Sequence, residues 1–326
     1  METKKLYLAN FNVTFGDEDE PLLTWLDEFV LPAMQMKLER TLSDKKSKVM
    51  FKNVKVGYLE EELVVTGIII KDTELEVYSQ LDSNQEIVNT NKILPSAPLS
   101  IFLIYLKNHR MFLVRNQKGS PDLRLFSSTF EYAIKEYRKI INKSRRENKQ
   151  ELLPYAIASV KGIKQVASID DALKNVKKIT KVTMKLKPTN NEFMGMDSLL
   201  GSLEENFSKK IAAKTTKVSA TAPQSIKGVK EVIKQTNGVA EIELGVEYHT
   251  DDYYPEGEKK KKAVGRIKDG DMTKAIDIEV NDNLTKAYKE VSMFCKGIEE
   301  MCVETPNIVE YEKYLQKRKM RDGSGK

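Results

Sequence analysis

Histidine and cysteine are scarce in this chain of 326 residues, which contains two of each. Two histidines leave little material for a Ser-His-Asp triad or for a metal site built from several imidazoles. Cys295 and Cys302 stand seven residues apart, and on one helix their Cα atoms would be about 10 Å apart, too far for a disulfide. No C-x-x-C zinc spacing occurs either. We therefore expect two reduced thiols and a cytoplasmic protein.

Long apolar runs and the common phosphate and cofactor motifs are also missing. The longest apolar stretches, ELVVTGIIIK and SIFLIYLK, are too short to cross a bilayer, and METKKLYLANFNVTF lacks the layout of a signal peptide. No G-x-S-x-G, G-x-x-x-x-G-K-[ST] or G-x-G-x-x-G appears. These absences argue against the nucleophile elbow of an α/β-hydrolase, the P-loop of a nucleotide-binding protein and the dinucleotide site of a Rossmann fold. They favour a non-catalytic protein without a membrane span.

The composition is that of a globular protein with a mild basic excess. Hydrophobic residues make up 40% and charged residues 31%, and 54 basic against 48 acidic side chains give a net charge of +6. The length suggests two domains. Residues 144–150 contain no apolar side chain, so we place the boundary there. We predict an antiparallel β-rich domain with two helices over 1–147 and an α+β domain with a C-terminal helix over 148–326.

Apolar periodicity predicts the elements of the first half. Alternation up to Phe15 predicts a strand, and Pro21 followed by leucines at helical spacing predicts a helix. Strands at 49–58, 63–70 and 74–78, separated by LEEE and KDT, predict a meander. A tight hairpin is expected around Lys107–Arg110, and a long helix is expected to start at Ser128, which has capping-box spacing to Glu131.

The second half alternates between strand and helix patterns. Strands are predicted at 155–160, 178–188, 217–222 and 239–248, helices at 168–176, 196–211, 225–236 and 284–300, and a hairpin within 253–282. This order predicts an α+β protein: a mostly antiparallel N-terminal β domain with flanking helices and a C-terminal α/β sandwich-like domain.

Basic residues fall into four clusters: the run at 259–262, the helix end at 135–146, the strand near 181–187 and the C-terminus. Phosphate binding needs lysine and arginine on one face, and sequence alone leaves open whether the clusters share one. The alternative is a lysine-rich surface that only keeps the protein soluble. The predicted nucleic-acid-binding residues are Arg138, Lys139, Arg145, Arg146, Lys181, Lys185, Lys259, Lys260, Lys261, Lys262 and Arg266.

Two acidic clusters offer alternative chemistry. Asp269, Asp277 and Glu279 resemble the carboxylates of a Mg²⁺-dependent nuclease, but Asn281 stands where such an enzyme would place lysine. Alternation of the last two with apolar residues also fits a strand with one face in water. His249 with Asp251 and Asp252 could form a metal or acid–base site. We favour a simpler interpretation of that cluster, a turn formed by Thr-Asp-Asp.

These patterns together predict a non-catalytic bacterial protein that binds DNA or RNA or serves as a subunit of a protein complex. A metal-dependent nuclease with a degenerate acidic site is the alternative. Abundant lysine and asparagine with only 16 glycines are typical of low-GC bacteria. Cytosolic chains of this size without common enzyme motifs often belong to phage-defence or mobile-element loci, which is the setting we expect. The oligomeric state is left open.

Overall fold

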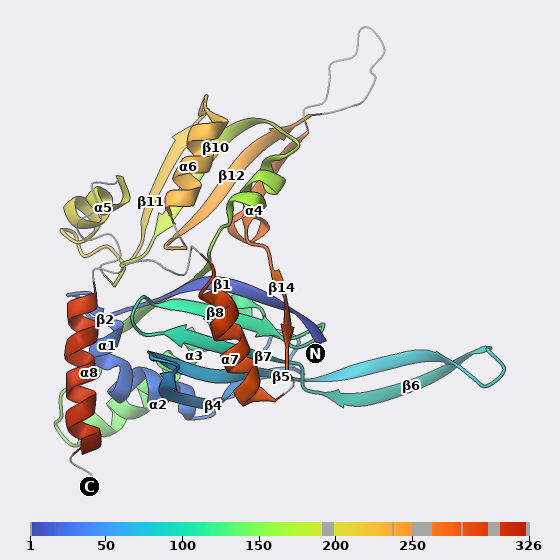
Figure 1. The fold of residues 1–326 in the computed structure, drawn as a ribbon, viewed down its shortest axis with the longest axis horizontal. Helices are drawn as coiled ribbons and strands as arrows, with labels where there is room; N and C mark the ends of the chain where they lie inside the picture. The colour runs from blue at the N-terminus through green and yellow to red at the C-terminus, as the bar shows by residue number, and fades with distance from the viewer. Residues whose placement is uncertain are drawn as a thin grey trace.

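The structure is a computed structural model that describes residues 2–190, 199–236, 238–249, 263–281, 283–298 and 307–323. It contains a ten-stranded and a four-stranded sheet with helices packed on both. The small sheet stands above the large one in Figure 1. The predicted α+β class is confirmed.

The large sheet is antiparallel and curled, with the strand order β14-β1-β8-β7-β5-β4-β3. Strand β1 is its hub, because it pairs with β8 on one edge and with β14 and then β9 along the other. The strands are β1 Glu2–Phe15, β2 Glu20–Pro21, β3 Arg40–Thr41, β4 Lys48–Leu59, β5 Glu62–Leu81, β6 Ile87–Ser96, β7 Leu99–Tyr105, β8 Arg110–Arg115, β9 Ala156–Gly162 and β14 Ile276–Val280.

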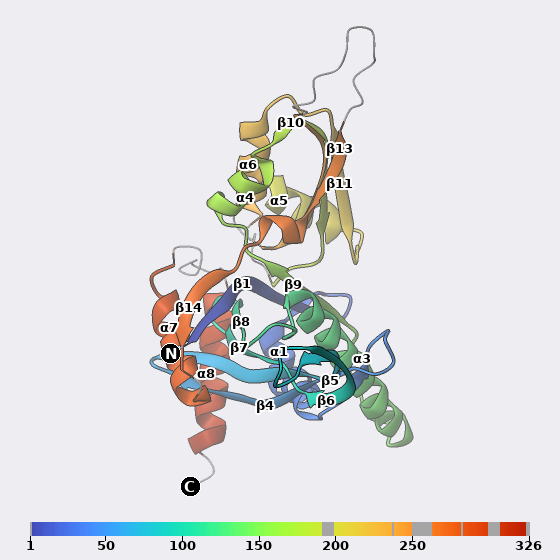
Figure 2. The same cartoon turned by 90° about the vertical axis from the view of Figure 1, so that its right-hand side faces the viewer.

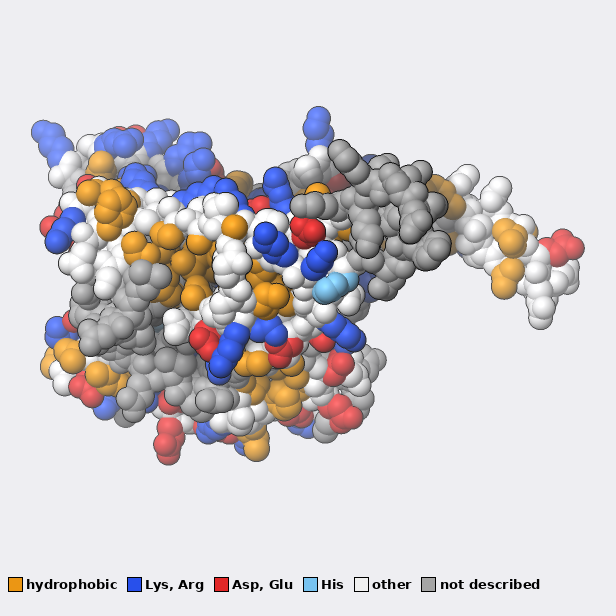
Figure 3. All heavy atoms as spheres, turned by 90° about the horizontal axis from the view of Figure 1, so that it is seen from above, with side chains coloured by type: hydrophobic (Ala, Val, Ile, Leu, Met, Phe, Trp, Pro, Cys, Tyr) orange, Lys and Arg blue, Asp and Glu red, His pale blue; other side chains and the backbone are white. Residues whose placement is uncertain are grey.

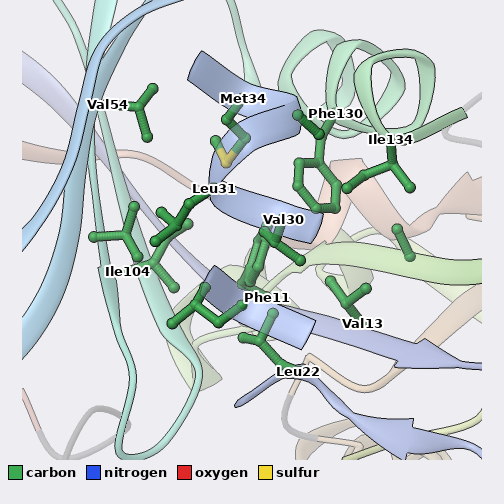
Figure 4. Close-up of a cluster of buried hydrophobic side chains, with 14 of the residues drawn as sticks. Phe11, Val13, Leu22, Val30, Leu31, Met34, Val54, Ile104, Phe130 and Ile134 are labelled. Atoms are coloured by element: carbon green, nitrogen blue, oxygen red, sulfur yellow. The ribbon is translucent and has the colours of Figure 1, made fainter. Parts of the chain in front are cut away.

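Helices cover both faces of the large sheet. One face packs against α1 Leu22–Trp25, the π-helix η1 Leu26–Val30, α2 Leu31–Gln35, α3 Leu123–Glu147 and α8 Ile308–Gly323, and the other against α7 Leu284–Cys295. Side chains from β1, α1, α2 and α3 meet in the first core (Figure 4). There Phe126 of α3 lies edge-to-face against Phe51 and Phe102, with ring centroids 5.2 and 5.1 Å away. This packing fixes the position of α3.

The small sheet has helices on one face and a polar surface on the other. Its order is β11-β10-β12-β13. Apolar residues at every second position of β12 point into a core with α4 and α6, and three of the alternate positions carry glutamates (Glu241, Glu243 and Glu247). Its elements are α4 Val166–Leu173, β10 Val176–Leu186, α5 Leu199–Leu203, the π-helix η2 Glu204–Ser208, β11 Thr216–Thr221, α6 Ile226–Gln235, β12 Ala240–Tyr248, β13 Val264–Lys268 and the 3₁₀ turn η3 Asp269–Met272.

Buried asparagines join the chain that follows β10 of the small sheet to β1 and α1 of the large sheet. Asn12 of β1 accepts a hydrogen bond from the backbone N–H of Asn190 at 2.9 Å and donates to the carbonyl of Pro188 at 2.6 Å. The Asn190 side chain accepts from the N–H of Leu22 at 2.8 Å and so satisfies the start of α1. Asn307 donates to the carbonyl of Asn190. The chain that leaves β10 is thereby tied to the large sheet.

Some element predictions are confirmed and some are wrong at their ends. The β7–β8 hairpin forms around Lys107–Arg110, with the positive φ at His109 (55°). The long helix starts at Leu123, because Asp122 accepts from the N–H of Leu125 at 2.8 Å and caps it. Ser128 lies inside the helix, where its hydroxyl accepts from Arg40 at 2.6 Å.

The predicted KDT turn is wrong. Strand β5 continues through Lys71–Thr73 to Leu81, turns at residues 82–86 and returns as β6. Helix α8 was not predicted, since its sequence stood out only for its charges. The predicted helix 196–211 is described from Leu199 on and consists of α5 and η2.

The large sheet crosses the boundary predicted between residues 147 and 148. Strands β9 and β14 both pair with β1, and α7 and α8 pack on the large sheet. The small sheet and its helices lie between β9 and β14 in the sequence. Which parts can fold independently stays a prediction.

Candidate nucleic-acid interface

A cleft of about 410 Å³ lies between α3, which packs on the large sheet, and the end of β10 in the small sheet. Figure 2 shows α3 and the edge strand β11 on the same side of the molecule. The lining residues come from four separate regions of the sequence: Glu131, Ile134, Lys135 and Arg138 of α3, residues 155–158 at the start of β9, Lys187 after β10, and Lys214 with Thr215 before β11.

Helix α3 presents a basic stripe to this cleft. Its apolar residues Phe126, Phe130 and Ile134 recur every four positions and are buried against the sheet. Lys135, Arg138, Lys139, Asn142 and Arg146 recur at helical spacing on another face and line a hollow of about 260 Å³. Lys135 and Arg138 line both spaces. The hollow along α3 therefore adjoins the cleft.

Positive charge dominates this lining. Its charged side chains are Lys135, Arg138, Lys139, Arg146, Lys187 and Lys214 against Glu131 alone, which is six basic and one acidic. The ammonium of Lys187 lies 3.6 Å from Glu131 and donates to the carbonyl of Ala158 at 2.7 Å. Lysines and arginines gather along one edge of the molecule seen from above (Figure 3). A concave surface of one sign concentrates oppositely charged ligands.

Lys214 is held in place by an aromatic ring. Its ammonium lies 4.2 Å from the ring centroid of Tyr155, a cation–π contact. The Tyr155 hydroxyl donates to Asp17 at 2.8 Å. Burial, together with the neighbouring Asp17 carboxylate, raises the pKa of Tyr155 to about 12. The phenol is therefore neutral at physiological pH and keeps this hydrogen bond.

The predicted lysines of β10 lie on the open face of the small sheet, away from its core. Lys185 is opposite Glu241 of β12, and its ammonium lies 3.7 Å from the Glu241 carboxylate. The same carboxylate accepts a hydrogen bond from the ammonium of Lys161 at 2.9 Å. The hydrogen bond from Lys161 is the main cause of a lowered pKa at Glu241. Arg266 of β13 lies 3.5 Å from Glu243. The glutamates of β12 thus neutralise this part of the face, whereas Lys181 is exposed.

The structure brings together only part of the predicted basic set. Arg138, Lys139 and Arg146 line the hollow. Arg145 lies at the edge of the stripe, where its guanidinium pairs with Glu28 and donates to the carbonyl of Glu151 at 2.9 Å. It joins α3 to η1 and to the following loop. Lys259, Lys260, Lys261 and Lys262 lie outside the described residues.

Three basic lining residues were absent from the predicted set, although the first two lie within predicted basic clusters: Lys135, Lys187 and Lys214. Lys135 precedes Arg138 by one helical turn, so the periodicity of α3 could have identified it. Lys214 follows η2 in a connection, and no local pattern indicates that it would lie beside Tyr155. Only the fold brings it to the cleft.

The acidic residues of the nuclease alternative are engaged elsewhere. Asp269 forms a 2.8 Å ion pair with Lys164 and accepts from the N–H of Ile242 at 2.8 Å. Asp277 pairs with Lys5 at 2.7 Å on the exposed side of β14, and Glu279 is exposed on the same strand. The buried alternate residues of β14 confirm the half-exposed strand. Within the described residues, no three His, Cys, Asp or Glu side chains form a group that could hold a metal ion.

The second acidic candidate is described only at its histidine. His249 is exposed, and its backbone N–H donates to the carbonyl of Asn175 at 3.1 Å. Asp251 and Asp252 lie outside the described residues. Across the part of the chain that the structure describes, no helix is long and apolar enough to cross a membrane. Comparison with protein-family models, curated proteins and solved structures gives no match to this chain.

Proposed function

We propose that this protein binds the phosphate backbone of DNA or RNA through the cleft and the basic stripe of α3. The observation that carries the proposal is the lining itself, in which six basic and one acidic side chains from separate segments line two adjoining hollows that share Lys135 and Arg138. Each ammonium or guanidinium group that meets a phosphate releases a condensed counterion, and that release drives binding.

The contacts of the lining favour binding without strong base preference. The ring of Tyr155 already has Lys214 over its face, so the cleft offers cations rather than a free stacking platform. Arg138 donates to the carbonyl of Leu153 at 3.1 Å, and Lys187 donates to Ala158. These bonds orient both side chains before a ligand arrives. Oriented backbone contacts fix a nucleic acid in position but do not specify its sequence.

Titration of labelled single-stranded DNA, single-stranded RNA and duplex DNA with the full chain tests this proposal. Fluorescence anisotropy is followed between about 50 and 200 mM salt. We expect binding that weakens steeply with salt and differs little between unrelated sequences. Absence of binding at the lowest salt, or affinity that does not change with salt, contradicts the proposal.

The setting that we propose for this activity is the bacterial cytoplasm, in a phage-defence or mobile-element locus. Cys295 is a free, buried cysteine, and burial raises the pKa of its thiol, which suits a compartment where thiols stay reduced. Plaque counts on cells with and without the gene test the defence role. Equal plaque numbers with every phage tested contradict it.

A further inference from the structure

The two-stranded ribbon formed by the second half of β5 and the whole of β6, residues 72–97, is an insertion in the large sheet; we call it the arm. Ile70 of β5 pairs with Leu99 of β7, and the N–H of Lys71 donates to the carbonyl of Pro98 at 2.9 Å. The chain thus leaves the sheet and re-enters it at adjacent points. In Figure 1 the arm projects far from the body. A two-residue turn could close the sheet without it.

The arm adds nothing to the cores of the protein. All of its residues are described, and none of them belongs to the buried hydrophobic set, which passes from Ile69 to Ile101. Its larger apolar side chains face solvent instead, with exposed fractions from 47% at Leu94 to 77% at Ile87. A lone two-stranded hairpin is marginally stable in water. Exposed apolar patches of this kind mark interaction surfaces.

The arm has an apolar face and an acidic character. Leu75 lies opposite Leu94 and Leu81 opposite Ile87, and Leu75 and Leu81 are six residues apart on β5, so the four side chains share one ribbon face, with Val77 and Lys92 between the two pairs. The arm carries five acidic residues and one basic residue (Asp72, Glu74, Glu76, Asp82, Glu86 and Lys92), a net charge of −4. The rest of the chain has 53 basic and 43 acidic residues, a net charge of +10. Charge therefore favours contact between an arm and a body over contact between two arms.

The area of the arm leads to the same choice. Ten residues of β5 extend about 33 Å and two strands are about 10 Å wide, so one ribbon face covers about 330 Å². Two arms packed face to face would bury about 660 Å² in total, below the roughly 1,000 Å² that a specific interface needs. Two arms that each cover part of the other body would bury about 1,300 Å², which is within the usual range.

We propose that the protein forms a two-fold dimer in which the arm of each copy lies across the body of the other. The apolar face of the arm is covered in this arrangement, and its carboxylates meet the more basic partner. The contact is reciprocal, so it closes after two copies and does not grow into a filament. This proposal is independent of nucleic-acid binding.

Sedimentation equilibrium of the full chain tests the dimer. We expect twice the chain mass of 37.2 kDa at about 10 μM. A variant in which Asn-Gly replaces residues 72–97 is expected to be monomeric, to lose only the strand signal of the arm from its circular dichroism spectrum and to unfold cooperatively. Leu81→Glu with Ile87→Glu should weaken association at least about 100-fold. The control Ser83→Glu with Asn84→Glu adds the same charge at the turn and should remain dimeric. A full chain that is monomeric at about 100 μM, or a control that dissociates equally, overturns the proposal.

A photo-crosslinker locates the partner surface. Benzoylphenylalanine replaces Leu81 in the full chain, the crosslinked dimer is isolated, and its peptides are mapped by mass spectrometry. We expect crosslinks to residues outside 72–97 of the second copy. Crosslinks confined to residues 72–97 would show two arms in contact and overturn the proposed arrangement.

Discussion

Asp269→Asn should destabilise the protein, because Asp269 neutralises a buried lysine. The side chains of Lys164 and Asp269 are 1% and 15% exposed, and their charged atoms are 2.8 Å apart. The Lys164 ammonium also donates to the carbonyl of Ala240 at 3.2 Å. Removal of one partner from a buried ion pair costs about 3–5 kcal/mol, since the other charge is left without compensation. Asparagine can still accept from the N–H of Ile242, so we expect a loss of about 3 kcal/mol.

A double-mutant cycle separates this structural role from catalysis. Lys164→Met alone leaves a partly exposed carboxylate and should cost about 2 kcal/mol. The double variant leaves no buried charge, so it should also lose about 2 kcal/mol, compared with a sum of about 5 for the two single changes. Urea unfolding followed by circular dichroism gives each free energy of unfolding.

Two results would refute this reasoning. One is an Asp269→Asn protein within about 0.5 kcal/mol of the unchanged protein, the scatter of ordinary surface substitutions. The other is additivity of the two single changes. A metal-binding role would give a different outcome, in which Asp269→Asn abolishes nuclease activity and leaves stability unchanged.

Two further predictions concern the joints of the fold. Asn190→Ala should lower the free energy of unfolding, measured in urea, by about 2–4 kcal/mol, because the buried N–H of Leu22 and the buried side-chain carbonyl of Asn12 each lose a hydrogen-bond partner. The control Asn84→Ala, at an exposed position, should change the free energy of unfolding by less than about 0.5 kcal/mol. The Glu241 carboxyl has a pKa held below its usual 4.5 in the fold, so the stability from its contact with Lys161 is present above that pH and is lost as pH falls through the lowered pKa. Glu241→Gln should flatten the acid side of the stability–pH curve, and an unchanged curve would contradict this.

Local patterns predicted much of the fold, and long-range pairing accounts for what they missed. Alternation identified β1, two apolar runs on either side of Lys107–Arg110 identified the β7–β8 hairpin, and Ser225 marked the start of α6, where it accepts from the N–H of Gly228. Nothing near residues 276–280 indicates that β14 pairs with Glu2–Leu6. The predicted strands of the arm ended at residue 78 and did not include β6. The side chains of the arm are exposed on both faces, so the sequence there lacks the alternation that distinguishes a core face from a solvent face.

The candidate interface was predictable where it lies on one helix. Spacing along α3 places Arg138, Lys139 and Arg146 on one side. Neutralisation of Lys185 depends on the register between β10 and β12, which brings Glu241 opposite it. The role of Asp269 depends on Lys164, a residue far away in the sequence. Sequence patterns alone cannot assign such pairs.

The salt dependence of nucleic-acid binding tests the role of the cleft most directly. The variant is Lys135→Gln with Lys139→Gln and Lys214→Gln, and the control is Lys52→Gln with Lys55→Gln and Lys118→Gln, three exposed lysines outside the cleft that give the same change in charge. The slope of log K against log salt is negative. We predict that in the cleft variant its magnitude decreases by about 2 for single strands and about 3 for duplex DNA, and that it stays unchanged in the control. Equal slopes for the two variants would contradict a nucleic-acid site in this cleft.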